Sequence, residues 1–170
     1  MKRFYFIFCW IVFGFVATSF QLPGYTRVFW PGHYSITLPG SKKLPVTCTI
    51  EVVKYSSDMV RNGWWGIGGS YAPEDSPKSV ISSITFLIGK KEILSPLSSF
   101  ADLANPQWAK VQKIAKGYRL VIAGGDGAFS YSVTVDFNND SVTRRTVTGG
   151  QVPGKPSETT QYGPNKPAEF

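Results

Sequence analysis

Alternating side chains between residues 118 and 137 constrain the fold of this chain more than any other feature. In the second half of this stretch, five apolar residues take every second position: Phe129, Tyr131, Val133, Val135 and Phe137. Successive side chains of a β-strand point to opposite faces, so the alternation predicts a strand with one apolar and one polar face. A second apolar run, from Tyr118 to Ala123, precedes four residues, Gly-Gly-Asp-Gly, that favour tight turns. The stretch therefore predicts a β-hairpin.

The turn sequence at residues 124–127 has a second interpretation, because it resembles the GGDG motif of the NAD kinase and diacylglycerol kinase families. In those families the glycines approach phosphate groups and the aspartate assists nucleotide chemistry. The residues that follow do not fit: Ala128 stands where these families typically carry threonine, and strict strand alternation comes next. A motif predicts a site only in its structural context, so we interpret these residues as a hairpin turn.

Several other segments have the composition of antiparallel strands. Strands are expected where β-branched and aromatic residues alternate with polar ones between turn residues, namely at 33–38, 46–55, 79–88, 91–94 and 141–148. Together with the hairpin, the last of these forms a β-meander at the C-terminal end of the domain. Residues 64–71 combine aromatic residues with glycines and fit either a bulged strand or a loop.

Residues 96–116 predict one or two short helices packed on this sheet. Ser95 and Asn105 each precede a proline, which is the order of a capping residue and a first helical residue. Trp108, Val111 and Ala115 would then share the helix face that covers the hairpin. The expected fold class is α+β, mainly an antiparallel sheet of about six to eight strands with these helices against it.

The first residues differ from the rest. Lys2 and Arg3 precede residues 4–20, which carry no charge, as in a secretory signal with cleavage after Ser19. The alternative is an uncleaved membrane anchor, since the apolar run is close to the length that spans a bilayer. We therefore expect 1–19 to be a signal peptide or N-terminal anchor and the protein to be exported, periplasmic, extracellular or tethered to the membrane through residues 4–20.

The remaining chain divides into a domain and a tail. Residues 20–148 have the length and apolar content of a single α+β domain. Residues 149–170 are rich in Pro, Gly, Ser, Thr and Lys, which predicts an extended or disordered C-terminal tail. Without Lys2 and Arg3 the formal net charge falls from +7 to +5, with no dense basic run, so nucleic acid is not an expected partner.

Residues that could carry catalysis or bind a metal are sparse. His33 is the only histidine, which excludes sites built from several histidines. The stretch that begins at Asp136 resembles the start of a calcium loop, but Ser141 and Val147 occupy the positions that need glycine and glutamate. Cys48 lies on the apolar face of its strand and is expected to be a buried small side chain. We expect no cofactor and no metal.

The most suggestive cluster for binding is Trp64, Trp65 and Tyr71. Aromatic side chains on a glycine-rich segment can stack on sugar rings or enter a partner's pocket, although they also dominate β cores. The leading hypothesis is a non-enzymatic binding or structural module that contacts an envelope component, either protein or polysaccharide. Two alternatives stay open: a small cell-wall hydrolase with a spatially assembled site, and an inhibitor or immunity protein against a secreted enzyme.

Overall fold

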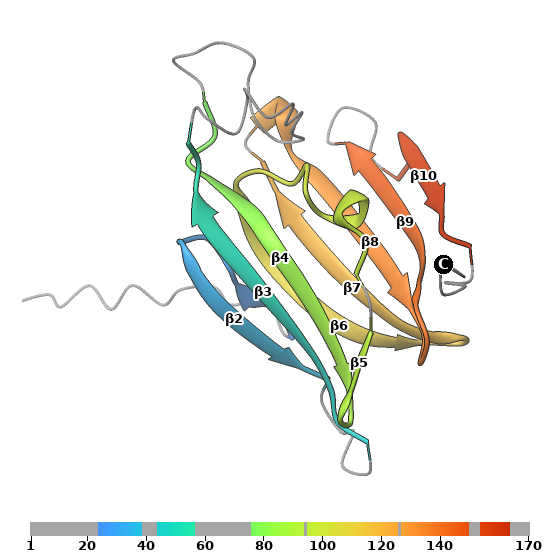
Figure 1. Cartoon of the computed structure of the whole chain (residues 1–170). Coiled ribbons are helices and arrows are strands. Elements are labelled where there is room, and N and C mark those ends of the chain that lie inside the picture. The colour runs from blue at the N-terminus through green and yellow to red at the C-terminus, as the bar shows by residue number, and fades with distance from the viewer. Residues whose placement is uncertain are drawn as a thin grey trace, which may run out of the picture.

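Antiparallel strands in two sheets make up almost all of the regular secondary structure of the described chain (Figure 1). The computed structural model describes residues 24–38, 44–56, 76–93, 95–125, 127–149 and 154–163. One sheet has the order β2-β3-β4-β5, formed by Gly32–Thr37, Val46–Lys54, Ser79–Ile88 and Lys91–Ile93. The other has the order β1-β6-β7-β8-β9-β10, formed by Thr26–Arg27, Pro106–Ile114, Gly117–Gly124, Tyr131–Phe137, Val142–Gly149 and Glu158–Gln161.

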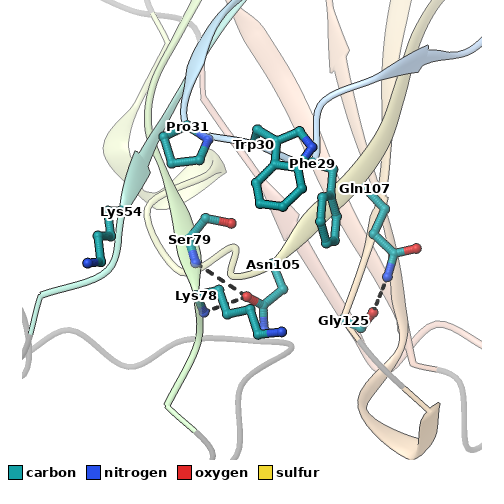
Figure 2. Close-up of a pocket in the computed structure, with 9 residues that line it drawn as sticks. All are labelled: Phe29, Trp30, Pro31, Lys54, Lys78, Ser79, Asn105, Gln107 and Gly125. Atoms are coloured by element: carbon teal, nitrogen blue, oxygen red, sulfur yellow. Dashed lines mark hydrogen bonds between the residues drawn. The ribbon is translucent and has the colours of Figure 1, made fainter.

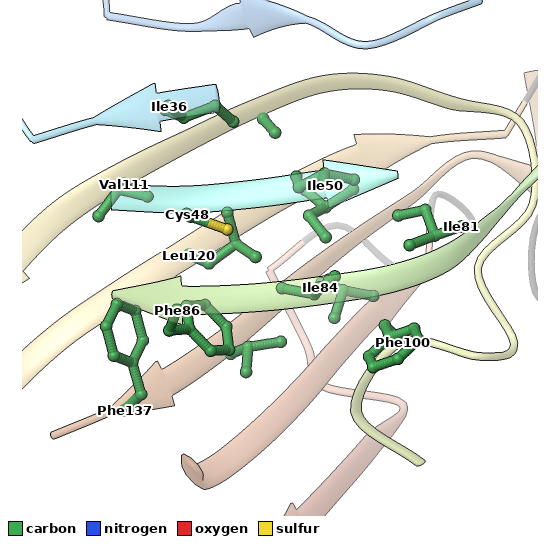
Figure 3. Close-up of a cluster of buried hydrophobic side chains, with 14 of the residues drawn as sticks. Ile36, Cys48, Ile50, Ile81, Ile84, Phe86, Phe100, Val111, Leu120 and Phe137 are labelled. Atoms are coloured by element: carbon green, nitrogen blue, oxygen red, sulfur yellow. The ribbon is translucent and has the colours of Figure 1, made fainter. Parts of the chain in front are cut away.

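The two sheets pack face to face around one apolar core (Figures 1 and 3). The Phe86 ring of β4 stacks on the Phe137 ring of β8, with centroids 4.1 Å apart and planes at 27°. Side chains such as Ile50 and Leu120, from opposite sheets, are fully buried in the same cluster. Burying each such side chain contributes about 1.5–3 kcal/mol to folding. Cys48 is among these core residues, as predicted, and burial raises the pKa of its thiol.

The predicted hairpin is confirmed as β7 and β8, which pair from Tyr118 with Phe137 to Gly124 with Tyr131. The connection is longer than the tight turn we expected, because β8 begins at Tyr131 and Phe129 lies in a 3-10 turn, η3 (Gly127–Phe129). The Phe129 side chain is 51% exposed, so it does not continue the apolar face. Gly125 has φ +76° and lies so close to the Phe129 backbone that a Cβ atom would collide there.

The helical prediction for residues 96–116 is wrong. Only η2 (Leu97–Ser99) is helical there, and residues 106–114 form β6 between β1 and β7. Ala109 and Val111 are buried toward the core, whereas Trp108 belongs to the outer face and Ala115 to the turn after the strand. Apolar residues on both faces gave the segment a three-residue spacing, and pairing with two neighbouring strands overrides that local pattern.

Asn105 does not cap a helix. It has φ 46°, in the left-handed region that asparagine tolerates better than most residues, and Pro106 opens β6. The Asn105 Oδ1 atom accepts hydrogen bonds from the backbone N–H groups of Lys78 and Ser79, at 2.8 and 3.3 Å. The residue therefore joins the start of β4 in one sheet to the start of β6 in the other.

Two segments lie outside the domain that was predicted from sequence, the N-terminal 1–19 and the C-terminal 149–170. The structure describes part of the second and none of the first. Residues 158–161, within the predicted tail at 149–170, form β10 and pair with β9. Tyr162 packs against the edge of the core. Residues 1–19, the expected signal peptide or anchor, lie outside the described residues. Among those described, no helix has the length and apolarity needed to span a membrane.

Candidate binding pocket

A pocket of about 410 Å³ opens at the end of the sandwich where β4 and β6 begin (Figure 2). Its walls come from both sheets and from the connection between β1 and β2. The lining residues are the aromatic and ring side chains of Phe29, Trp30 and Pro31, the lysines Lys54 and Lys78, and the polar or backbone groups of Ser79, Asn105, Gln107 and Gly125. The pocket thus draws on five separate parts of the chain.

The aromatic wall is held by the turn before β2. The Tyr34 hydroxyl donates a hydrogen bond to the Trp30 carbonyl at 2.5 Å and accepts one from the Trp30 N–H at 3.2 Å. The Phe29 and Trp30 rings meet edge to face, with centroids 4.9 Å apart. With its backbone fixed in this way, the Trp30 side chain remains 67% exposed and forms one side of the pocket opening (Figure 2).

Two side-chain amides fix the base of the pocket (Figure 2). The side-chain oxygen of Asn105 accepts hydrogen bonds from the backbone N–H groups of Lys78 and Ser79. Its backbone carbonyl accepts a hydrogen bond from the Gly125 N–H at 3.0 Å. The Gln107 Nε2 atom donates to the Gly125 carbonyl at 2.7 Å. Left-handed backbone such as that of Asn105 persists only where the surroundings hold it in place, and it is frequent at binding sites.

The charged side chains among the described lining residues are both positive. Lys54 and Lys78 both border the pocket, and none of the described residues that line it carries a carboxylate. An ammonium group is a compact charge that attracts carboxylate, phosphate or sulfate groups. In the same lining, the exposed Trp30 indole offers a flat apolar surface. The arrangement therefore suits a ligand that combines an anionic group with a flat or ring-shaped apolar face.

The predicted binding residues Trp64, Trp65 and Tyr71 lie outside the described residues. The chain reaches residues 57–75 from the end of β3 and returns to the start of β4, beside Lys54 and Lys78. The sequence prediction of binding residues did not include Phe29 and Trp30. Their signal was the aromatic pair directly before Pro31 and Gly32, which are typical of a turn.

His33 lies elsewhere, on the outer face of the four-stranded sheet. Its side chain is 74% exposed, with Nε2 3.7 Å from the Glu51 carboxylate. The Ser83 hydroxyl donates to the other Glu51 oxygen at 3.1 Å. A serine nucleophile needs the histidine as its base, whereas here the hydroxyl bonds the carboxylate, so this trio does not have the geometry for nucleophilic catalysis.

Two clusters of charged side chains lie in the six-stranded sheet. Asp136 of β8 bonds two arginines on the outer face, and Arg145 of β9 bonds two carboxylates on the core side. Neither borders the pocket. Within the described residues, no group of three or more His, Cys, Asp or Glu side chains could hold a metal ion.

A comparison of the chain with protein-family models, curated proteins and solved structures found no match.

Proposed function

We propose that this protein is an exported, non-enzymatic binding module whose pocket binds an anionic ligand with a sugar-like ring. The observation that carries the proposal is that Lys54, Lys78 and the exposed Trp30 ring line one pocket, whose described lining residues carry positive charge only. A volume of about 410 Å³ falls within the usual range for small-molecule sites, about 300–1,000 Å³, so it suits one or two rings.

The ligand chemistry follows from the lining. The aliphatic face of a sugar ring packs on an indole, as other flat apolar groups do. The two lysines favour a negative charge on that sugar, and Asn105 and Gln107 supply amide groups of the kind that orient polar ligands. A polysaccharide with uronic acid units has both features. Among the envelope components that the sequence suggests, we therefore favour an anionic polysaccharide.

Trp64, Trp65 and Tyr71 remain a prediction within this proposal. The chain connects their segment directly to β3 and β4, whose ends border the pocket. Their replacement by alanine, all three together, is expected to weaken binding if they contact the same ligand. Unchanged affinity in the triple variant would remove them from the site.

The binding proposal is tested with galacturonate and with galactose, its neutral counterpart, in an NMR titration of the protein. The wild type is expected to bind galacturonate at least tenfold more tightly than galactose. The double variant Lys54→Ala/Lys78→Ala should remove that preference, and Trp30→Ala should weaken binding of both sugars. Equal affinity for the two sugars, or a double variant that behaves as wild type, would overturn the proposal.

A matched control is available at the other end of β4. Lys90 is exposed in the turn between β4 and β5, whereas Ser79 at the start of β4 lines the pocket. Lys90→Ala removes one positive charge without touching the site, so it should keep the galacturonate preference.

The export part of the proposal is tested separately by the mass of the protein isolated from producing cells, which should lack residues 1–19 if the signal is cleaved.

A further inference from the structure

Aromatic and cationic side chains gather on the outer face of the six-stranded sheet, along β1 and β6. We call this set the aromatic–cation strip; its members are Tyr25, Arg27, Phe29, Trp108 and Lys110. The chain alternates here, because Val28 and Ala109 between them are fully buried in the core. The strip is thus the outward half of a strand pair whose inward half is apolar.

The cations of the strip are positioned by rings. The Arg27 guanidinium lies 5.6 Å from the centre of the Phe29 ring and 5.8 Å from that of Trp108. The Lys110 Nζ atom lies 4.3 Å from the centre of the Tyr25 ring. Contacts of this length between a cation and an aromatic ring are attractive, so the rings hold both cations in place. Within the described residues neither cation forms a salt bridge, so both charges remain available to an external anion.

The strip continues into the pocket. Phe29 belongs to both, since its ring contacts Arg27 and also lines the pocket. Gln107, next to Trp108 in β6, anchors the pocket base. Arg27 pairs with Trp108, which is two residues from Lys110 along β6. At about 3.4 Å per residue, the backbone positions of Arg27 and Lys110 are therefore about 7 Å apart along the strand direction.

We propose that the aromatic–cation strip docks a linear anionic polysaccharide, one unit of which occupies the pocket. This inference rests on the proposed function of the pocket and extends it from a single sugar to a polymer. A row of cations leading to a cationic pocket matches a chain that carries charge on successive units. The half-buried rings that contact these cations add apolar surface on which its sugar faces can pack. Charge complementarity supports the same occupant, because the formal net charge of the protein is +7, and +5 without Lys2 and Arg3.

The test compares galacturonate oligomers of one, two, four and six units. Wild-type affinity is expected to rise at least tenfold from the monomer to the hexamer. The double variant Arg27→Gln/Lys110→Gln should lose this gain and keep monomer affinity, whereas Arg27→Lys/Lys110→Arg should retain most of it. Lys90→Ala, again the matched charge control, should behave as wild type. Melting temperatures of all variants establish that each one is folded.

The outcomes separate the strip from the pocket. If the monomer binds and the length gain is absent, or persists in the glutamine variant, the strip inference is overturned and the pocket function stands. If the hexamer binds through Arg27 and Lys110 while the monomer does not bind, docking on the strip stands, whereas the pocket function and the placement of one unit in the pocket are overturned. Tighter binding to a 12-nucleotide oligo-dT or to phosphatidylglycerol vesicles than to the hexamer would overturn the choice of a polysaccharide.

Discussion

Asp136 and Arg145 lie on the neighbouring strands β8 and β9, and both side chains are buried. Each forms ion pairs with two side chains of opposite charge, but the two residues face opposite sides of the six-stranded sheet. Asp136 pairs across the strands with Arg144 on the outer face. Arg145 pairs with Val135 and shares its orientation toward the core. The same pair of strands thus holds one charged cluster against solvent and another against the apolar interior.

The outer cluster satisfies its hydrogen-bonding capacity. Both Asp136 oxygens are used: Arg119 donates to them at 2.5 and 2.9 Å, and Arg144 donates twice to one of them, at 3.1 and 2.7 Å. Burial alone would raise the pKa of Asp136, but the hydrogen bonds and charges of the two arginines outweigh it and hold the pKa below its ordinary value. Bidentate contacts of this kind are among the strongest polar interactions in proteins.

The inner cluster is less complete. Arg145 donates to Asp102 at 2.6 Å and to Glu158 at 2.5 Å, which joins the segment after η2 and strand β10 to β9. The buried atoms Asp102 Oδ1 and Arg145 Nε have no hydrogen-bond partner in the described structure. Burial raises the pKa of Asp102 more than Arg145 lowers it. The two clusters have inverse compositions, one carboxylate with two arginines and one arginine with two carboxylates. Only in the inner one does burial outweigh the ion pair in the pKa of its aspartate, so this cluster acts chiefly to fix where the chain segments lie.

The largest effect should come from removing the centre of the inner cluster. Arg145→Ala leaves Asp102 and Glu158 without their cation and opens a cavity, so the free energy of unfolding should fall by about 3 kcal/mol. Urea denaturation measures the change. The double variant Asp102→Leu/Arg145→Met replaces the pair by apolar side chains and should recover most of the loss. A single variant as stable as wild type would mean that the inner cluster carries no structural role.

A smaller effect is expected on the outer face. Asp136→Asn keeps the shape of the side chain but removes the charge between two arginines, which at 27% and 44% exposure can turn toward water. The free energy of unfolding should fall by about 1–2 kcal/mol in the same urea experiment. If Asp136→Asn proved more damaging than Arg145→Ala, the ranking of the two clusters would be reversed.

The two clusters should respond to acid with opposite signs. Asp136 has a lowered folded pKa, so its stabilisation is present above the unfolded value of about 3.9 and is lost as the pH falls below it. Asp102 has a raised folded pKa, so the folded state gains protons first and its contribution to stability rises as the pH falls toward about 3.9. Stability measured between about pH 6 and pH 3 should therefore decline less in Asp136→Asn and more steeply in Asp102→Asn. Identical slopes in both variants would contradict the assignment.

The smallest effect belongs to an ion pair in water. Asp140 bonds Lys91 at 2.8 Å, with side chains 80% and 59% exposed. Asp140→Asn is chemically the same change as Asp136→Asn, and we expect it to alter the unfolding free energy by less than about 0.5 kcal/mol. It therefore serves as the reference for the other variants, and a loss above about 1 kcal/mol would show that exposure does not set the ranking.

The parts of the fold that sequence analysis predicted share one property, a single apolar face. Strands such as β3 and β8 alternate cleanly, and both were predicted within one or two residues. β6 was not predicted as a strand, because Trp108 on its outer face and Val111 on its inner face have the three-residue spacing expected for one face of a helix. β10 has the sequence Glu-Thr-Thr-Gln, with no apolar residue to mark it, and its position depends on pairing with β9.

The candidate site was harder to predict than the fold. Its residues come from segments as far apart as Phe29 and Gly125, and only the packing of two sheets brings them together. The aromatic residues at 64–71 are close together in the sequence and were therefore easy to recognise as a cluster. No motif in the sequence around Lys54 or Lys78 indicated that the two lysines line one pocket. Distances between such groups depend on strand order, which periodicity alone does not determine.

Strand β1 also has a consequence for the order in which the protein folds. Most neighbours in the six-stranded sheet follow one another along the chain, from β6 to β10, so their pairing closes short loops. β1 instead joins β6 across the sequence of the whole four-stranded sheet, which places Arg27 opposite Trp108. Closing such a long loop costs more chain entropy, and we expect β1 to add last. Arg27 would then contact the rings of Phe29 and Trp108 only in the final folding step. Binding of an anionic polymer at the proposed aromatic–cation strip would therefore require that folding is complete.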